Sequence, residues 1–196
     1  LDTGFELFKE MNSRGIKPSS ITYGILIKAY GKSNHLEKAF NIFEMMKDQN
    51  ISINDVTYGC LMDACVKNDQ VDMAVGLLRR MHEDKIPVNT VLMTTLIKGF
   101  SRQGRYSEAM QVFDTMKTNP RSKPNLITFN CILDSCVRAG QLPKAISLFD
   151  EMFLTIKPDL ITFSTIIKGC CRAGNMKLGN KYLDKMLELN LKPDEA

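Results

Sequence analysis

Five cationic side chains recur in this 196-residue sequence at spacings of 35, 35, 36 and 34 residues. They are Lys32, Lys67, Arg102, Arg138 and Arg172. Lys and Arg neutralise phosphate groups, so a regular row of cations is typical of contact with a nucleic-acid backbone. Cations in the last turn of a helix also complement the helix dipole, whatever the function. We expect phosphate contact at these five positions, with helix-end stabilisation as the alternative.

Two further rows of small or polar side chains share this spacing. The first row is Gly24, Gly59, Thr94, Asn130 and Ser164, and the second is Asn54, Asn89, Asn125, Asp159 and Asp194. Amide and carboxylate groups can hydrogen-bond the edge of a base. Asn and Asp are also preferred as N-caps and in turns, which is the structural alternative for the second row.

Other residues of catalytic or metal-binding type do not form a site in the sequence. The cysteine pairs Cys60/Cys65 and Cys131/Cys136 occupy the same two positions of the repeat, without a Cys-x-x-Cys or a nearby His, so we interpret them as packed thiols. His35 and His82 have no carboxylate or nucleophile at a fixed spacing. We therefore expect no metal, no cofactor and no catalytic activity.

These rows belong to an internal repeat. Apolar residues define five units, residues 21–55, 56–90, 91–126, 127–160 and 161–195, and residues 1–20 match the second half of a sixth unit. In the first unit Tyr23, Leu26, Ile27 and Tyr30 follow helical spacing, and a second apolar pattern starts at Leu36. Each unit is thus predicted to be a helix-turn-helix hairpin.

The repeated hairpins predict how the chain folds. Between the two helices stand Asn34, Asp69, Gly104, Gly140 and Gly174, residue types that tolerate the left-handed conformation of a helix-ending turn. A single hairpin cannot bury its apolar face, so hairpins stack on their neighbours. We expect an all-α fold, a right-handed α-solenoid forming one array over residues 1–196. The first polar row should lie on its concave surface, because it follows an aromatic core position.

Composition narrows the class of protein. The net charge of +4 is small, so any anion site must be local. The chain contains no apolar run of the roughly 18 residues that a membrane-spanning helix needs, so we expect no membrane partner. Six cysteines without a secretory leader favour a reducing compartment over a disulfide-framed domain.

The repeat resembles the pentatricopeptide repeat family. The resemblance rests on the 35-residue period and on the strings Ile127-Thr128-Phe129-Asn130, Arg138-Ala139-Gly140 and Lys157-Pro158-Asp159. The related tetratricopeptide family is typified by a Trp that this chain lacks. Near-uniform unit lengths resemble the class of the family that is built only of standard repeats.

The resemblance implies binding of single-stranded RNA, one base per repeat, in a mitochondrion or plastid. The two polar rows would then read the bases. The base would be sandwiched between the aliphatic residues that open the units, which are Ile21, Val56, Val91, Ile127 and Ile161.

The family code carries over to three of the five pairs. Thr94 with Asn125 suggests adenine, Asn130 with Asp159 uracil, and Ser164 with Asp194 guanine. The pairs Gly24/Asn54 and Gly59/Asn89 depart from the defined combinations, so the expected target is 5′-N-N-A-U-G-3′.

The expected function is sequence-selective RNA binding in organellar RNA processing, stability or translation, without catalysis. The alternatives are a scaffold subunit of an organellar ribosome or another large assembly, with protein partners, and the RNA-binding arm of a larger enzyme.

Overall fold

The computed structural model describes residues 2–192, without the side chains of Asp2, Thr3 and Phe5. Within that range the chain forms eleven α-helices and one short 3-10 helix, with no strand, so the predicted all-α class is confirmed. The chain divides into two compact units, of which the first ends at Gly99 and the second begins at Phe100. Each unit is described by itself below.

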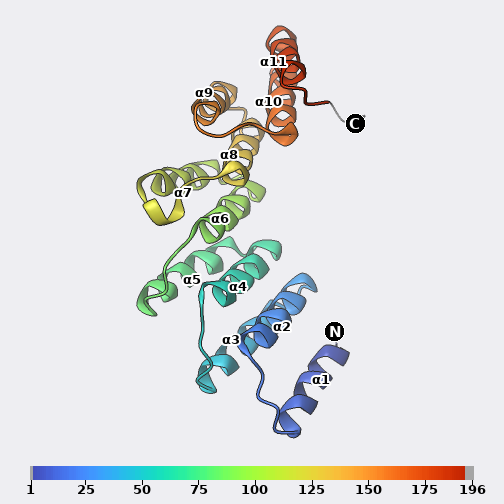
Figure 1. Cartoon of the computed structure of the whole chain (residues 1–196), viewed down its shortest axis with the longest axis vertical. Coiled ribbons are helices and arrows are strands. Elements are labelled where there is room, and N and C mark those ends of the chain that lie inside the picture. Colours follow the sequence, from blue (N-terminus) through green and yellow to red (C-terminus); the bar gives the residue numbers. More distant parts are fainter. Residues whose placement is uncertain (1, 193–196) are drawn as a thin grey trace. The chain divides into compact units, whose positions relative to one another are not determined.

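The first unit contains helices that follow one another in chain order (Figure 1). They are α1 (Asp2–Ser13), α2 (Ser20–Lys32), α3 (Leu36–Asp48), α4 (Asp55–Lys67), α5 (Val71–Glu83) and most of α6 (Thr90–Arg102). Helix α2 packs against both α3 and α4, and α4 packs against α5. The first helix of one hairpin therefore lies beside the first helix of the next.

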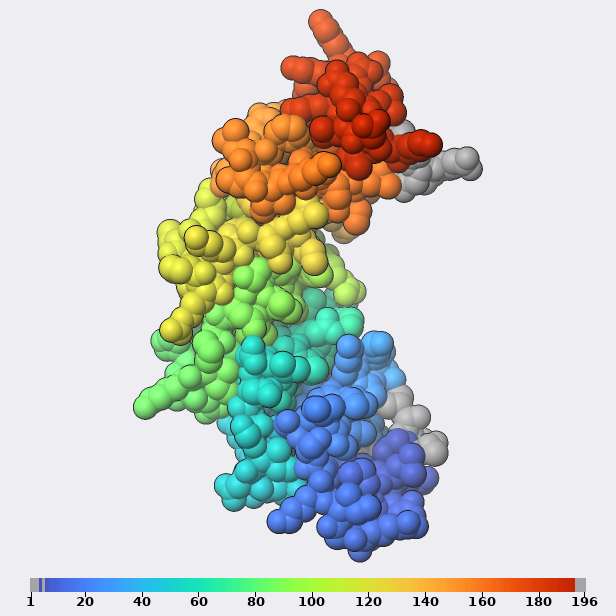
Figure 2. Space-filling view, viewed as in Figure 1, coloured from blue at the N-terminus to red at the C-terminus, as the bar shows by residue number. Residues whose placement is uncertain are grey.

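The second unit repeats this arrangement. After the end of α6 it contains α7 (Tyr106–Thr118), η1 (Pro120–Ser122), α8 (Leu126–Arg138), α9 (Leu142–Phe153), α10 (Leu160–Arg172) and α11 (Met176–Glu188). Helix α8 packs against α7, α9 and α10, and α10 packs against α11. Within each unit the sequence colours of Figure 2 succeed one another in order, because each hairpin contacts its neighbours in the chain.

Side-chain caps fix the start of the first helix in most hairpins. The side chains of Ser19, Asn54, Asn125 and Asp159 each accept a hydrogen bond from the backbone N–H three residues later. At α8 and α10 a Thr hydroxyl returns the contact to the cap backbone, which completes a capping box. The helices that carry the polar rows thus begin at defined residues.

Left-handed turns join the helices of each hairpin. The five predicted turn residues all have positive φ, from 57° at Asp69 to 70° at Gly104 and Gly140. Only glycine and, less readily, Asn and Asp adopt this conformation at low cost. The turn prediction is therefore confirmed at all five positions.

Edge-to-face aromatic contacts join successive hairpins inside each unit. The ring of a second helix meets the ring of the following first helix at centroid distances of 5.1 to 5.3 Å. The pairs are Phe8/Tyr23, Phe43/Tyr58, Phe113/Phe129 and Phe149/Phe163. Such pairs add about 1 kcal/mol each beyond the area they bury.

Small and flexible residues fill the space around these rings. The second helices bury the row Ala39, Ala74, Ala109, Ala145 and Gly179, and the row Met46, Met81, Met116, Met152 and Met186. The first helices thereby keep one face on the core and leave the opposite face to solvent. No helix in residues 2–192 is long and apolar enough to cross a membrane.

Candidate nucleic-acid interface

Five branched aliphatic side chains are exposed at the starts of the first helices. Their exposed fractions are 72% for Ile21, 66% for Val56, 68% for Val91, 56% for Ile127 and 61% for Ile161. Each is followed two residues later by the core residue of its helix, so the aliphatic side chain lies on the opposite face. These aliphatic side chains recur once per hairpin and stay largely exposed among the described residues, so they are available for apolar contact with a ligand.

Ile21 and Val56 line one pocket of the first unit. The pocket has a volume of about 300 Å³ and is also lined by Gly24 and Asn54. A Cβ at Gly24 would meet only Cys60 Sγ, at 3.9 Å, so the glycine leaves the pocket open. The structure thus brings together the four residues that the sequence assigns to the first base.

A second pocket lies between Val56 and Val91. Its volume is about 410 Å³, and its lining includes Gly59 and Asn89. Val56 therefore lines both pockets, which is the arrangement expected if each pocket holds one base. The second pocket thus brings together the residues that the sequence assigns to the second base.

In the second unit the predicted pair Asn130 and Asp159 is in direct contact. Asn130 Nδ2 donates to Asp159 Oδ1 at 3.1 Å, and the Thr162 hydroxyl donates to Asn130 Oδ1 at 2.7 Å. Burial raises the pKa of Asp159, but hydrogen bonds from Thr162 and Asn130 outweigh it and hold this pKa below its ordinary value. The carboxylate is thus ionised and acceptor-only at neutral pH.

The remaining predicted pairs are placed differently. Thr94 is only 5% exposed, and its hydroxyl donates to the Thr90 carbonyl at 2.7 Å, so the expectation of an open surface position is wrong for this residue. Thr94 belongs to the first unit and Asn125 to the second. Ser164 is exposed as expected, whereas its predicted partner Asp194 lies outside the described residues.

The Asn and Asp row has a structural role as well. Asn54, Asn125 and Asp159 are N-caps, and Asn89 Oδ1 accepts from the Leu92 N–H at 3.1 Å. Capping occupies one side-chain oxygen. The Nδ2 group of an Asn cap remains available for another contact.

All five residues of the predicted cation row are exposed in the last turn of a first helix. Two of them are paired within their own helix: Lys67 with Asp63, and Arg138 with Asp134 at 2.6 Å. The cation row is therefore not uniform, because two of its five residues form ion pairs. Lys32 and Arg172 contact no carboxylate among the described residues.

Two of the cations meet at one hollow of the second unit. Arg102 and Arg138 both line a pocket of about 180 Å³, together with Ser101 and Ser135. Guanidinium and hydroxyl groups in one small hollow can bind a phosphate. The geometry is therefore compatible with phosphate contact as well as with helix-end stabilisation.

Sequence analysis missed a second charged row, which lies four residues before the first. Its residues are Lys28, Asp63, Lys98, Asp134 and Lys168. The alternation explains these two ion pairs, since Lys67 and Arg138 belong to the hairpins with Asp at this position. Lys28 and Lys98 are exposed and line the pocket between Val56 and Val91. Aligning the repeats at this position would have revealed the alternation.

Comparison with known protein families decides the assignment. A family profile described as "Pentatricopeptide repeat-containing protein" matches residues 3–116, more than half of the chain. The chain belongs to the pentatricopeptide repeat family. Profiles described as "PPR repeat family" and "PPR repeat" match residues 124–172 and 161–191.

Curated pentatricopeptide repeat proteins match short parts of the chain. A chloroplastic pentatricopeptide repeat-containing protein of Arabidopsis thaliana is 33% identical over 61 residues, which cover 31% of this chain and 13% of the relative. The mitochondrial 15S rRNA processing factor CCM1 of Saccharomyces cerevisiae is 36% identical over 61 residues, 31% of this chain and 7% of that protein. The chain thus corresponds to a small part of these relatives.

Solved pentatricopeptide repeat structures match nearly the whole chain. Maize PPR10 has a TM-score of 0.76 at 23% identity, covering 93% of this chain and 26% of that chain. PPR10 in complex with an 18-nt psaJ RNA element has a TM-score of 0.79 at 24% identity, covering 94% and 27%. The repeat domain of Arabidopsis thaliana protein-only RNase P 1, solved with tRNA, has a TM-score of 0.70 at 17% identity, covering 86% and 89%. These likenesses confirm the α-solenoid fold.

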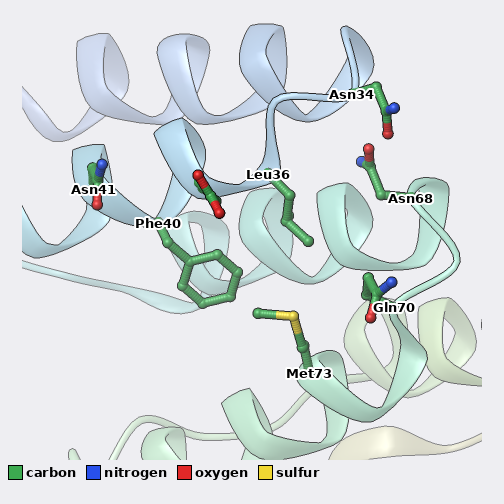
Figure 3. A pocket seen from close by; sticks show the side chains of 8 residues that line it. Asn34, Leu36, Phe40, Asn41, Asn68, Gln70 and Met73 are labelled. Atoms are coloured by element: carbon green, nitrogen blue, oxygen red, sulfur yellow. The ribbon is translucent and has the colours of Figure 1, made fainter.

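The second helices of the pentatricopeptide repeats form a different kind of pocket. A hollow of about 540 Å³ lies in the first unit, where Phe40 of α3 and Met73 of α5 provide apolar walls (Figure 3). The amides of Asn34 and Asn68 point toward one another at its edge (Figure 3). Among the described residues that line it, none belongs to the predicted base, sandwich or phosphate rows.

The cysteines fall into packed and partly exposed sets. Cys65, Cys136 and Cys170 are buried, and burial is the main cause that raises the pKa of Cys65 to about 12 and that of Cys136 to about 11. Cys60 and Cys131 are half-buried, so the interpretation of these two as core thiols is only partly right. No cluster of three metal-binding side chains occurs in the part of the chain that the structure describes.

Proposed function

We propose that this chain binds single-stranded RNA in a sequence-selective manner, with each pentatricopeptide repeat contacting one base. The observation that carries the proposal is the pair of pockets between Ile21, Val56 and Val91. Each pocket has an exposed aliphatic wall on two sides and an Asn amide in its lining. A flat base matches two facing apolar walls, and its edge needs a polar partner.

The charges around the pockets suit an unpaired strand. Lys28 lines both pockets, and Lys98 lines the second. Cations beside an apolar slot hold the backbone while the base enters the slot. The cation row supplies further phosphate contacts, led by Lys32 and Arg172, which have no carboxylate partner among the described residues.

The base assignments rest on the family code. The predicted repeats, residues 21–55 to 161–195, are retained as the reading units, with uracil for Asn130/Asp159 and guanine for Ser164/Asp194. Adenine for Thr94/Asn125 is retained from the code alone, because Thr94 is buried. The direct contact between Asn130 and Asp159 supports the uracil assignment, because the two side chains are close enough to bind the edge of one base together.

The relatives support the same function and an organellar site of action. PPR10 was solved with a psaJ RNA element, and the repeat domain of protein-only RNase P 1 with tRNA. The curated relatives include a chloroplastic protein and a mitochondrial rRNA processing factor. We place this chain in a mitochondrion or plastid, acting in RNA processing, stability or translation, and assign it no chemical step of its own.

A scaffold role in a large organellar assembly is the second candidate. The observation that favours it is the pairing of Lys67 with Asp63 and of Arg138 with Asp134, which removes two cations from the phosphate row. A scaffold needs no affinity for free single strands, so a direct binding measurement separates the two functions.

The test is a fluorescence titration of the 196-residue chain with a labelled single strand containing A-U-G and with the same sequence as a duplex. We expect binding of the single strand only. Val56→Ser should weaken it about fivefold, since about 1 kcal/mol of apolar contact is lost. Leu154→Ser, at a residue that is 85% exposed and lies outside the pockets, is the matched control and should leave the affinity unchanged. Equal affinity of wild type and Val56→Ser would reject the pockets as base sites.

A further inference from the structure

A carboxylate that the base-reading pair does not include lies directly before the repeat over residues 56–90. Gly59 supplies no side-chain hydrogen bond, yet Asp55 lines the same pocket. Asp55 Oδ2 accepts a hydrogen bond from Asn89 Nδ2 at 2.8 Å, and Asp55 Oδ1 accepts from the Val56 N–H at 3.0 Å. Both side chains are half-buried. Asp55 is thus fixed beside the Asn of the reading pair, in a pocket that the glycine leaves open.

The two side chains retain hydrogen-bonding capacity after these contacts. Asn89 Oδ1 is used by the Leu92 N–H, and one N–H of its amide is used by Asp55, so the second N–H is left for a ligand. The carboxylate of Asp55 has about four lone-pair sites, of which two are used. The pair therefore presents one donor next to acceptors.

Guanine is the base whose pairing edge complements this order. Its O6 accepts, and the adjacent N1–H and N2–H₂ groups both donate. Uracil has one donor between two acceptors, adenine has one donor beside one acceptor, and cytosine has one donor beside two acceptors. None of the three can therefore satisfy a carboxylate with two adjacent donors.

The preceding repeat provides an internal comparison. Its pair is Gly24 and Asn54, the same residue types, but Ser20 stands where the next repeat has Asp55. Asn54 Nδ2 has no hydrogen-bond partner among the described residues. Two repeats with the same Gly and Asn thus differ at one position, where the first has the hydroxyl of Ser20 and the second has the carboxylate of Asp55.

We infer that Asp55, acting with Asn89, makes the repeat over residues 56–90 selective for guanine. This inference rests on the proposed RNA binding and extends the expected target from 5′-N-N-A-U-G-3′ to 5′-N-G-A-U-G-3′. The lining also includes Asp63, which is paired with Lys67, and the cations Lys28 and Lys98 offset the negative charge of Asp55.

The experiment measures the dissociation constants of the 196-residue chain for four single strands that differ only at the second N of 5′-N-N-A-U-G-3′. Wild type should bind the guanine strand about tenfold more tightly than the other three, the discrimination typical of one bidentate contact. Asp55→Asn, which keeps the shape of the side chain, and Asp55→Ser should abolish the preference. Ser20→Asp should create a guanine preference at the first N.

The outcomes separate the inference from the proposed function. Binding of all four strands with equal affinity by wild type overturns the role of Asp55 and leaves RNA binding intact. Absence of binding to every strand overturns the proposed function, and the inference with it. If Asp55→Asn, shown by circular dichroism to melt like wild type, keeps the guanine preference, Asp55 is not the specificity determinant.

Discussion

The amide of Asn130 and the carboxylate of Asp159 are hydrogen-bonded to one another at 3.1 Å, although 29 residues separate them in the chain. Thr162 holds both side chains, since its hydroxyl lies 2.7 Å from Asn130 Oδ1 and 2.8 Å from Asp159 Oδ1. The pair is therefore oriented before any ligand arrives. Preorganisation of this kind lowers the entropy lost on binding.

Exchange of Asn130 should change the base that this repeat prefers. Asn130→Thr removes the amide but retains a hydroxyl next to Asp159, a combination that resembles the Ser164/Asp194 pair proposed for guanine. We expect the preferred base to move from uracil to guanine by about tenfold in relative affinity. Competition binding with strands that differ at this position measures the change. An unchanged uracil preference would mean that the family code does not apply here.

The cation row should contribute unequally to the salt dependence of RNA binding. Lys32→Ala and Arg172→Ala should each make the log–log salt slope shallower by about 0.7, the value for one phosphate on a single strand. Lys67→Ala should have a smaller effect, because Lys67 is paired with Asp63. Titrations at two or more salt concentrations give these slopes.

Asp63→Asn is the converse variant, since it releases Lys67 without removing a cation. The ion pair is partly exposed, so its loss should cost less than about 1 kcal/mol of stability. The log–log salt slope of RNA binding should become steeper by up to about 0.7, because the released Lys67 can contact a phosphate. If the log–log salt slopes of Lys32→Ala, Lys67→Ala and Asp63→Asn all equal the slope of wild type, these cations stabilise helix ends only.

A close helix contact makes Gly31 sensitive to substitution. A Cβ at Gly31 would lie 2.3 Å from Ala64 Cβ and 2.9 Å from Ala64 Cα, so α2 and α4 must move apart in Gly31→Ala. We expect a loss of about 1 to 3 kcal/mol in the free energy of unfolding. Gly76→Ala is the control, because a Cβ at this helical position meets nothing within 4 Å, and it should stabilise α5 by about 1 kcal/mol. Urea denaturation measures both, and similar effects of the two variants would contradict the close contact.

The buried phenol of Tyr58 should make stability fall at alkaline pH. Burial, with a hydrogen bond that Tyr58 donates to Asp84, raises the pKa of Tyr58 far above its ordinary value of about 10. The folded state therefore favours the neutral phenol, and its contribution is complete below pH 10 and lost as the pH rises above 10. Between pH 9 and 11, wild type should lose about 1 kcal/mol more stability than Tyr58→Phe. Identical alkaline losses in urea denaturation would show that the phenol is not kept neutral.

The sequence predicted the parts of this structure that repetition specifies. The left-handed turns at Asn34 and Asp69 and the buried row around Met46 follow from backbone and packing constraints that every hairpin shares. The contact of Asp55 with Asn89 and the burial of Thr94 were not predictable, because each occurs in one repeat and depends on side-chain orientation. The Lys67/Asp63 pair has the four-residue spacing of a helical ion pair, so the sequence did carry that signal.

The most direct test of base insertion is photo-crosslinking with 4-thiouridine at the uridine of 5′-N-G-A-U-G-3′. The predicted uracil site lies between Ile127 at the start of α8 and Ile161 at the start of α10. Mass spectrometry should locate the crosslink in peptides that contain residues 126–130 or 159–163. Crosslinks confined to the second helices α9 and α11 would contradict the account.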